Sequence, residues 1–162
     1  MKIYTFKNKL FRFAVSLLKD ENEAEDVVQE VVIKLWKHRD RLDQINNLEA
    51  WSMKLTKNLS LDKMRSKHRR NESLDAAYSL SAKQKNPEQQ LELNDTVQRL
   101  KSWMYKLPEK QRLVFQLRDI EGLSYNEISE LLDMSLNQVK TNLFRARQAA
   151  KKYLIKNNDY EL

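Results

Sequence analysis

Residues 124–147 read SYNEISELLDMSLNQVKTNLFRAR, and this stretch determines how the C-terminal half of the chain folds. Ser124 and Glu127 match the Ser-x-x-Glu capping box that begins a helix. A three-residue turn at 133–135 separates this short helix from a longer one that begins near Leu136. The apolar seam of the longer helix recurs at helical spacing and consists of Val139, Leu143, Ala146 and Ala150. The pattern predicts a helix-turn-helix.

The side of the longer helix that faces away from this seam is polar and basic. At 100° per residue it holds Asn137, Thr141, Arg145 and Gln148, flanked by Gln138 and Phe144. Amides and guanidinium groups pair with base edges in the major groove, and an aromatic ring can contact a thymine methyl group. Lys140 and Arg147 lie on the shoulders, where phosphates would run. An ordinary bundle helix would carry Glu there, and none occurs between residues 131 and 160. We therefore predict DNA binding.

The composition favours an all-α protein. The chain has 162 residues, 41% of them hydrophobic, with one Gly and two Pro, so a turn-rich β fold is disfavoured. The absence of Cys excludes disulfides, thiol catalysis and Cys-based metal sites. The N-terminus does not resemble a signal peptide, and no apolar run of about 18 residues could span a bilayer. We predict a soluble, cytoplasmic protein without membrane contact.

The net charge of +7 is unevenly distributed. Residues 1–70 hold 16 Lys/Arg against 10 Asp/Glu, residues 71–95 hold 2 against 5, and residues 96–162 hold 12 against 8. Two basic blocks therefore flank an acidic connector. Net charge alone is weak evidence for nucleic-acid binding, because a solvated surface has the same composition.

The N-terminal block is expected to form three amphipathic helices. The first has the seam Phe6, Leu10, Phe13 and Leu17. The second follows Asp20 and uses Val27, Val28, Val31, Leu35 and Trp36. The third begins near Leu48 and uses Trp51, Leu55 and Leu59. Three such helices with short connections form a compact bundle.

Between the two blocks the helical period is lost. Residues 69–87 are polar, without sustained periodicity, and end in Asn-Pro. We predict two small helical domains joined by a flexible linker: an N-terminal domain at 1–70, the linker at 71–95 and a C-terminal domain at 96–158 that contains the helix-turn-helix. In the latter, Gly122 is placed just past a helix C-terminus.

A second basic segment precedes the linker. Residues 54–70 hold seven Lys/Arg and one acidic residue, with Asn58 and Trp51 on the same helical stretch. Basic, amide and aromatic side chains together suit nucleic acid, including unpaired strands. The alternative is that Trp51 belongs to the core, because it lies at seam spacing with Leu55 and Leu59.

No residues suggest catalysis. His38 and His68 lie in charged surroundings without a second ligand at metal spacing, and one glycine cannot form a Gly-rich phosphate loop. We expect no enzymatic activity, no metal, no cofactor and no small-molecule ligand.

Three segments taken together resemble a known family. AEDVVQEVVIKLW (24–36), NLEAWSMKLTKNLSLDKMR (47–65) and the long segment at 107–147 are similar, in order and spacing, to regions of bacterial extracytoplasmic-function (ECF) sigma factors of the sigma-70 family. The resemblance covers nearly the whole chain apart from the linker and the last few residues. It implies a sigma subunit of RNA polymerase with two helical domains.

The resemblance implies protein partners. The surface around Asp26, Gln29 and Glu30 would dock on the clamp helices of the largest subunit of core RNA polymerase. From the residues alone, this surface is only an exposed acidic helix face. Family members also contact the flap of the second-largest subunit, and many are held by an anti-sigma factor.

The resemblance also implies promoter contacts. Asn58 and Asp62 match positions that face the −10 element, and the loop at 43–47, which includes Asn46, matches one that captures a flipped base. Nearby phosphate contacts would come from Lys54, Lys57, Lys63, Arg65, Arg69 and Arg70. Contacts with the −35 duplex would come from Lys140, Thr141, Phe144 and Arg145.

Two positions depart from the family pattern. Asn142 stands where Arg is frequent, so it is expected to distinguish the promoter preference of this chain. Asp133 stands where the turn usually has Gly. Asp can adopt the left-handed backbone conformation, so we expect the turn to form.

Two other functions fit parts of the sequence. A stand-alone helix-turn-helix repressor would explain the C-terminal half, but neither DVVQE at 26–30 nor the basic segment at 54–70. A helical protein-interaction module without DNA binding would leave the polar face of the last helix unexplained. The expected function is therefore transcription initiation, with the repressor as the alternative.

Overall fold

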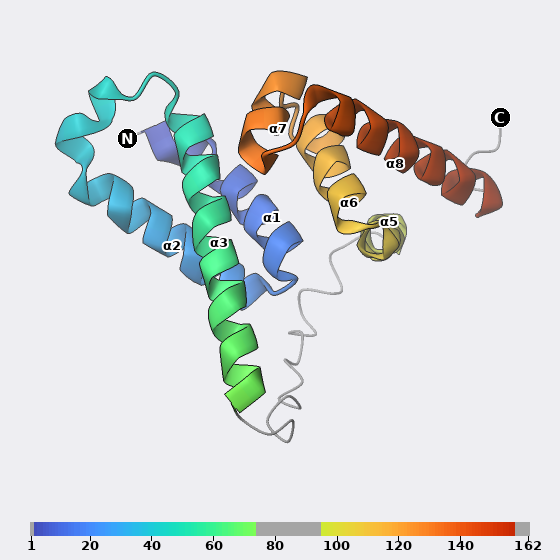
Figure 1. The fold of residues 1–162 in the computed structure, drawn as a ribbon, viewed down its shortest axis with the longest axis horizontal. Helices are drawn as coiled ribbons and strands as arrows, with labels where there is room; N and C mark the ends of the chain where they lie inside the picture. The colour runs from blue at the N-terminus through green and yellow to red at the C-terminus, as the bar shows by residue number, and fades with distance from the viewer. Residues whose placement is uncertain (1, 74–94, 158–162) are drawn as a thin grey trace. The chain divides into compact units, whose positions relative to one another are not determined.

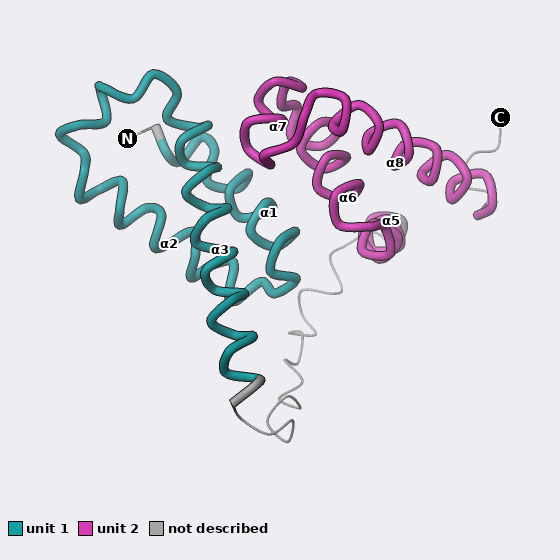
Figure 2. The backbone as a smooth tube through the Cα atoms, in the orientation of Figure 1, with its two compact units in different colours: residues 1–81 teal, residues 82–162 magenta. Residues whose placement is uncertain are grey.

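The structure, a computed structural model, describes residues 2–73 and 95–157. The chain divides into two compact units, residues 1–81 and 82–162 (Figure 2). Every element in the described parts is a helix (Figure 1), which confirms the predicted all-α fold. Of the predicted linker at 71–95, residues 74–94 lie outside the described residues. No helix within the described ranges is both long enough and apolar enough to cross a membrane.

The N-terminal unit contains three α-helices and two short 3₁₀ helices. Their bounds are η1 (Lys2–Thr5), α1 (Lys7–Leu18), α2 (Glu21–Lys37), η2 (Arg39–Gln44) and α3 (Leu48–Ser73). The side chain of Asp20 accepts a hydrogen bond from the backbone N–H of Glu23 (3.1 Å), so α2 begins where its acidic opening predicts. The three α-helices pack against one another around a core whose fully buried side chains include Leu10, Phe13, Val31 and Leu35.

The buried face of α3 is not the predicted one. Ser52, Met53, Thr56 and Ser60 are at most 1% exposed, whereas the predicted seam of Trp51, Leu55 and Leu59 is half-buried. Small Ser and Thr side chains allow α3 to approach both α1 and α2 closely. The Ser52 and Thr56 hydroxyls donate to the carbonyl oxygens of Leu48 (2.7 Å) and Ser52 (2.8 Å), which satisfies them within the helix.

Trp36 also differs from its predicted place in the core. Its side chain is 56% exposed at the last turn of α2. The guanidinium carbon of Arg39 lies 4.6 Å from the centroid of the Trp36 ring, and Arg39 Nη1 donates to the Trp36 carbonyl oxygen (3.0 Å). Trp36 therefore lies at the surface, where Arg39 contacts it.

The C-terminal unit contains α5 (Asp95–Lys106), α6 (Glu109–Phe115), the π-helical turn η4 (Gln116–Ile120), α7 (Tyr125–Leu132) and α8 (Leu136–Lys156). The capping box of Ser124 and Glu127 begins α7, as predicted. Asp133 has φ 52°, so the turn adopts the expected left-handed conformation without glycine. The seam of α8 is buried at Val139, Leu143 and Ala146 and half-buried at Ala150.

The sequence predicts one regular helix between Pro108 and Gly122, but the structure widens its second half into η4. Gly122 ends the element with φ 77°, and the N–H of Leu123 donates to the carbonyl of Leu117 (2.9 Å). A π-turn inserts one extra residue into a helix and rotates the residues that follow it. In the C-terminal unit, η4 contains Asp119, which forms an ion pair with Arg147 of α8.

Candidate nucleic-acid interface

The predicted DNA-facing side of α8 is exposed along its whole length. The exposed members are Asn137, Gln138, Lys140, Thr141, Phe144, Arg145 and Arg147. Phe144 is 64% exposed, although its neighbour Leu143 is 2% exposed. A large aromatic ring in water, surrounded by cations and amides, is typical of a surface that meets a partner.

Two amides on this helix are partly engaged by its own backbone. Gln138 Oε1 accepts a hydrogen bond from the N–H of Ser135 (3.0 Å), which completes a second capping box at the start of α8. Asn142 is half-buried and its Nδ2 donates to the Gln138 carbonyl oxygen (2.8 Å). Gln138 therefore retains its amide N–H groups for a base, and Asn142 retains its side-chain oxygen. The sequence pattern for a capping box, Ser-x-x-Gln at 135–138, could have indicated the first of these roles.

Arg147 is held by the protein itself. Its Nε and Nη2 donate to the two carboxylate oxygens of Asp119 at 2.9 and 2.6 Å, which is the bidentate geometry of a strong ion pair. The hydrogen bonds that Arg147 donates to the Asp119 carboxylate, opposed by desolvation, raise the pKa of Arg147 above its ordinary value. In the free protein Arg147 therefore joins α8 to η4, and its phosphate contact stays a prediction. Sequence reasoning missed Asp119 because the two residues are 28 positions apart.

η4 also contacts α7 through the residue next to Asp119. Arg118 Nη1 donates to the Leu123 carbonyl (2.8 Å), and its guanidinium lies 4.8 Å from the centroid of the Tyr125 ring. Arg118 and Asp119 thus connect one turn to both helices of the helix-turn-helix. This arrangement fixes the orientation of α8 within the unit.

Replacing Arg147 with alanine is expected to change stability but not the number of phosphate contacts. Loss of the half-exposed ion pair should lower the free energy of unfolding by about 0.5–1 kcal/mol. The slope of log binding constant against log salt concentration should stay unchanged for a −35 duplex. Lys140→Ala, by comparison, should reduce this slope by about 0.9 if Lys140 contacts one phosphate. Fluorescence anisotropy at several KCl concentrations measures both slopes, and an equal reduction for the two variants would contradict the structural role of Arg147.

The basic segment of α3 has two sides. Lys54, Asn58, Asp62 and Arg65 lie on one exposed side at spacings of four, four and three, and Lys57 lies half-buried beside them. Arg65 Nη1 lies 3.5 Å from Asp62 Oδ1. These are the residues that the sequence predicts for −10 recognition, and the helix brings them together.

The other side of this segment faces α2. Lys63 Nζ lies 3.2 Å from Asp26 Oδ2, and Lys67 Nζ lies 3.7 Å from Glu23 Oε1. Because α2 and α3 run in opposite directions here, the two pairs form consecutive rungs between the helices; we call them the α2–α3 ladder. Lys63 was predicted to contact phosphate, but the structure turns it toward α2.

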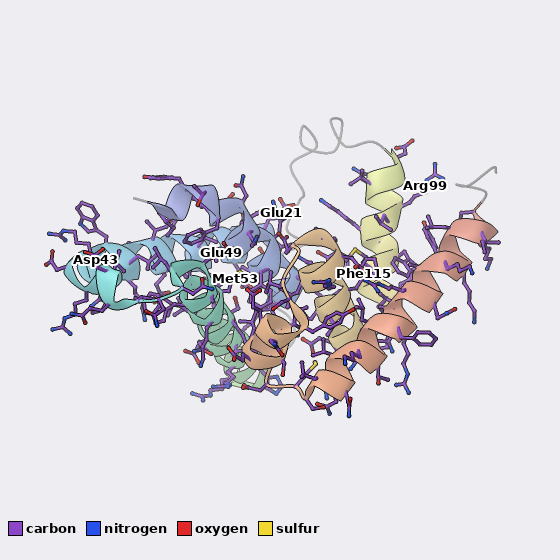
Figure 3. All side chains as sticks on the ribbon, turned by 90° about the horizontal axis from the view of Figure 1, so that it is seen from above. Glu21, Asp43, Glu49, Met53, Arg99 and Phe115 are labelled. Atoms are coloured by element: carbon purple, nitrogen blue, oxygen red, sulfur yellow. The ribbon has the colours of Figure 1, made fainter. Side chains whose placement is uncertain are left out.

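The predicted base-capturing loop at 43–47 contains the end of η2 and the connection to α3. Asn46 is exposed, and Asp43 (Figure 3) is exposed on η2. Asn47 Oδ1 accepts a hydrogen bond from the N–H of Ala50 (3.0 Å), which caps α3. Lys9 Nζ contacts Glu49 Oε1 at 2.5 Å and ties the same end of α3 to α1. The loop therefore begins and ends on fixed elements while the side chain of Asn46 faces solvent.

The predicted polymerase-facing side of α2 is exposed at Asp26, Gln29 and Glu30. Asp26 also belongs to the α2–α3 ladder. The same side continues into two large apolar residues, Ile33 (52% exposed) and Trp36 (56% exposed). Exposed apolar residues next to charged ones mark a protein-interaction surface. Hydrophobic periodicity did not indicate that these two residues are exposed, although Ile33 lies at the helical spacing i+7 from Asp26.

Candidate metal ligands do not gather in the described ranges, where no group of three or more His, Asp or Glu side chains could hold an ion. His38 and His68 are exposed.

Comparison with protein families identifies both units. Residues 3–70 match the family described as Sigma-70 region 2, and residues 98–149 match the family described as Sigma-70, region 4. Regions 2 and 4 in this order, one with an exposed basic helix and the other with a helix-turn-helix, define a two-unit sigma factor of the sigma-70 type.

Individual relatives show which group of sigma factors the chain belongs to. The chain is 31% identical over 161 residues to the ECF RNA polymerase sigma factor SigW of Bacillus subtilis (strain 168), with 92% of this chain and 84% of that protein covered. It is 30% identical over 150 residues to the ECF RNA polymerase sigma factor SigM of the same strain, with 90% and 88% covered. The chain belongs to the ECF family of RNA polymerase sigma factors.

Solved structures share the fold. RpoE of Bartonella quintana, in complex with the anti-sigma factor NepR, matches with a TM-score of 0.71 at 22% identity, covering 94% of each chain. CnrH, in complex with the cytosolic domain of CnrY, matches with a TM-score of 0.64 at 22% identity, covering 95% of this chain and 85% of CnrH.

The family membership confirms the predicted function. The protein is an alternative sigma factor, a transcription initiation factor that binds core RNA polymerase and promoter DNA and directs the enzyme to promoters. A stand-alone helix-turn-helix repressor, the alternative from the sequence, is excluded.

Proposed function

We propose that α8 reads the −35 element, that α3 and the loop before it read the −10 element, and that α2 docks on core polymerase. The observation that carries the −35 assignment is the exposed face of α8, which holds cations, amides and Phe144 and has no acidic residue. Such a face complements the edges and phosphates of a major groove.

On α8, the chemistry of each side chain suggests which part of the DNA it contacts. Arg145 can pair with guanine through two hydrogen bonds, and Phe144 can contact a thymine methyl group. Lys140 supplies a point charge for phosphate, and Thr141 and Asn137 can hydrogen-bond to bases or phosphates. All five side chains are exposed on one side of the helix.

On the N-terminal unit, the exposed side of α3 binds the opened promoter. Asn58 and Asp62 face the −10 element, and Asn46 belongs to the loop that receives an extruded base. Extrusion of a base costs a few kcal/mol, so favourable contacts in the loop must offset this cost and thereby make recognition selective. Lys54, Lys57 and Arg65 hold the flanking phosphates.

The partners follow from the same surfaces. The side of α2 with Asp26, Gln29 and Glu30 contacts the clamp helices of the largest polymerase subunit, and the C-terminal unit contacts the flap of the second-largest. The two solved relatives are complexes in which NepR, named as an anti-sigma factor, and CnrY are the partners. They support an anti-sigma factor as a third partner of this chain, which would act in the cytoplasm with its polymerase.

Replacing Glu30 with lysine should weaken binding to core polymerase at least about tenfold, because a misplaced charge at an interface costs several kcal/mol. Glu21→Lys is the matched control: both residues are exposed on α2, and nine residues of helix place them on opposite sides. Glu21 is labelled in Figure 3. Titration of labelled protein with core polymerase measures the affinity. Equal losses for the two variants would remove Glu30 from the interface.

The proposed division can be tested as a whole with purified protein and core polymerase. Promoters selected from random DNA should contain two separated elements, and permanganate reactivity should show strand opening at the downstream one. Selected DNA that contains only one element, or that stays closed, would contradict the assignment of one unit to each element.

A further inference from the structure

The exposed side of α8 contains an internal repeat. The chemical character of four positions recurs eleven residues later, in the pairs Asn137 with Gln148, Lys140 with Lys151, Phe144 with Ile155 and Arg145 with Lys156, and a fifth pair at the same spacing, Thr141 with Lys152, changes from a hydroxyl to a cation. Eleven residues of α-helix turn through 1100°, within about 20° of three full turns, so the members of each pair lie on the same side. All ten side chains are exposed, and Phe144 and Ile155 are each 64% exposed.

The second half of α8 is held in place by aromatic packing. The ring of Tyr153 stacks on Trp103 of α5 with a centroid distance of 5.5 Å and an interplanar angle of 25°. Trp103 in turn meets the edge of Phe115 of α6 at 6.1 Å and 84°. These contacts anchor the opposite side of the helix, so the side with the repeat faces solvent up to Lys156.

Within the described residues, the lysines of this second half have no acidic partner. α8 contains no acidic residue, and Lys151, Lys152 and Lys156 form no ion pair within residues 2–73 and 95–157. Arg147 of the same helix, by contrast, is neutralised by Asp119. A rigid helix side with three lysines and a preceding amide complements an anionic surface.

Two members of the repeat are lysines in the second half of α8 but not in the first half. Thr141 and Arg145, which can hydrogen-bond to bases, are replaced in the second half by Lys152 and Lys156. Lysine binds phosphate as a point charge and lacks the planar fork with which Arg reads guanine. Eleven residues place the second half about 16 Å farther along the helix axis. The major groove is only about 12 Å wide, so a helix that enters it at an angle with its first half places its second half at the phosphate backbone.

We propose that Lys151, Lys152 and Lys156 form a second DNA contact, with the phosphates of the duplex that flank the −35 element. This contact rests on the proposed −35 function of the first half of α8. It adds affinity and salt dependence without reading sequence. It also makes α8 a two-part element, in which the first half selects the site and the second half holds the duplex.

The test uses the full chain assembled with core polymerase, and compares K151Q/K152Q with wild type on a selected promoter and on a duplex with a scrambled −35 element. Removal of two phosphate contacts should reduce the slope of log binding constant against log salt concentration by about 1.8, equally on both duplexes. K101Q/K110Q removes the same charge from exposed positions on α5 and α6 and should leave the slope unchanged. Circular dichroism verifies that the helices are retained.

The outcomes separate this contact from the function on which it rests. If the K151Q/K152Q slope stays at the wild-type value while Arg145→Ala still abolishes the preference for the −35 sequence, the second contact is wrong and the proposed function stands. If Arg145→Ala has no effect on that preference, the −35 function of α8 fails as well. A variant that loses polymerase binding with an unchanged DNA slope would show that these lysines serve a protein partner, which also overturns the proposal.

Discussion

Replacing Leu143 with alanine is expected to lower the free energy of unfolding of the C-terminal unit by about 2–5 kcal/mol. Leu143 is 2% exposed and lies in the seam that holds α8 on its own unit, together with Val139 and Ala146. Truncation removes buried methyl groups and leaves a cavity that the neighbouring helices cannot fill completely. Because the helix-turn-helix depends on this seam, DNA binding should be lost at temperatures where the variant unfolds.

The adjacent residue provides the control for this experiment. Phe144→Ala removes a larger side chain that is 64% exposed, and should change stability by less than about 0.5 kcal/mol while weakening binding to the −35 duplex. Replacing Trp36 and Trp51 with Phe leaves Trp103 as the single tryptophan, so its fluorescence during urea denaturation reports on the C-terminal unit. A larger loss of stability for Phe144→Ala than for Leu143→Ala would mean that α8 is rotated from the orientation described here.

Replacing Arg145 with alanine is expected to weaken −35 recognition by about 1–3 kcal/mol, or about 5- to 150-fold, if its contact with guanine is bidentate. The loss should be confined to the promoter that has this guanine. Discrimination at that base pair should therefore relax, while affinity for other sequences changes little. Transcription from the selected promoter should fall in parallel.

The matched control is Arg99→Ala, an identical change at an exposed position of α5 in the same unit (Figure 3). Binding of the reconstituted holoenzyme to duplexes with each substitution in the −35 element measures the discrimination. Unchanged promoter binding and unchanged transcription for Arg145→Ala would remove this residue from the recognition surface.

The features that were predictable from the sequence are local ones. The capping box of Ser124 and Glu127 requires only residues three apart, and the seam of α8 requires only a period of 3.6. The left-handed conformation of Asp133 was expected because the family that the chain resembles usually has Gly at this turn, and Asp can adopt the same conformation.

The features that were missed depend on contacts between elements. α3 buries Ser52, Thr56 and Ser60, and hydrophobic periodicity cannot detect a buried face made of small hydroxyl side chains. The ion pair of Arg147 with Asp119 depends on the register of η4, which no local pattern indicates. Helical periodicity placed Arg147 and Gln138 correctly at the surface, but it could not show which of their polar groups are already engaged.

The α2–α3 ladder has a consequence for how substitutions on α2 are interpreted. Asp26 bonds to Lys63 and also lies on the side of α2 that we assign to the clamp helices. A partner cation that binds Asp26 competes with Lys63, so docking and the seating of the basic end of α3 share one carboxylate. Substitution of Asp26 is therefore expected to remove both the ion pair with Lys63 and the proposed docking contact, whereas Glu30, whose side chain forms no hydrogen bond or ion pair within the described residues, is expected to report on docking alone.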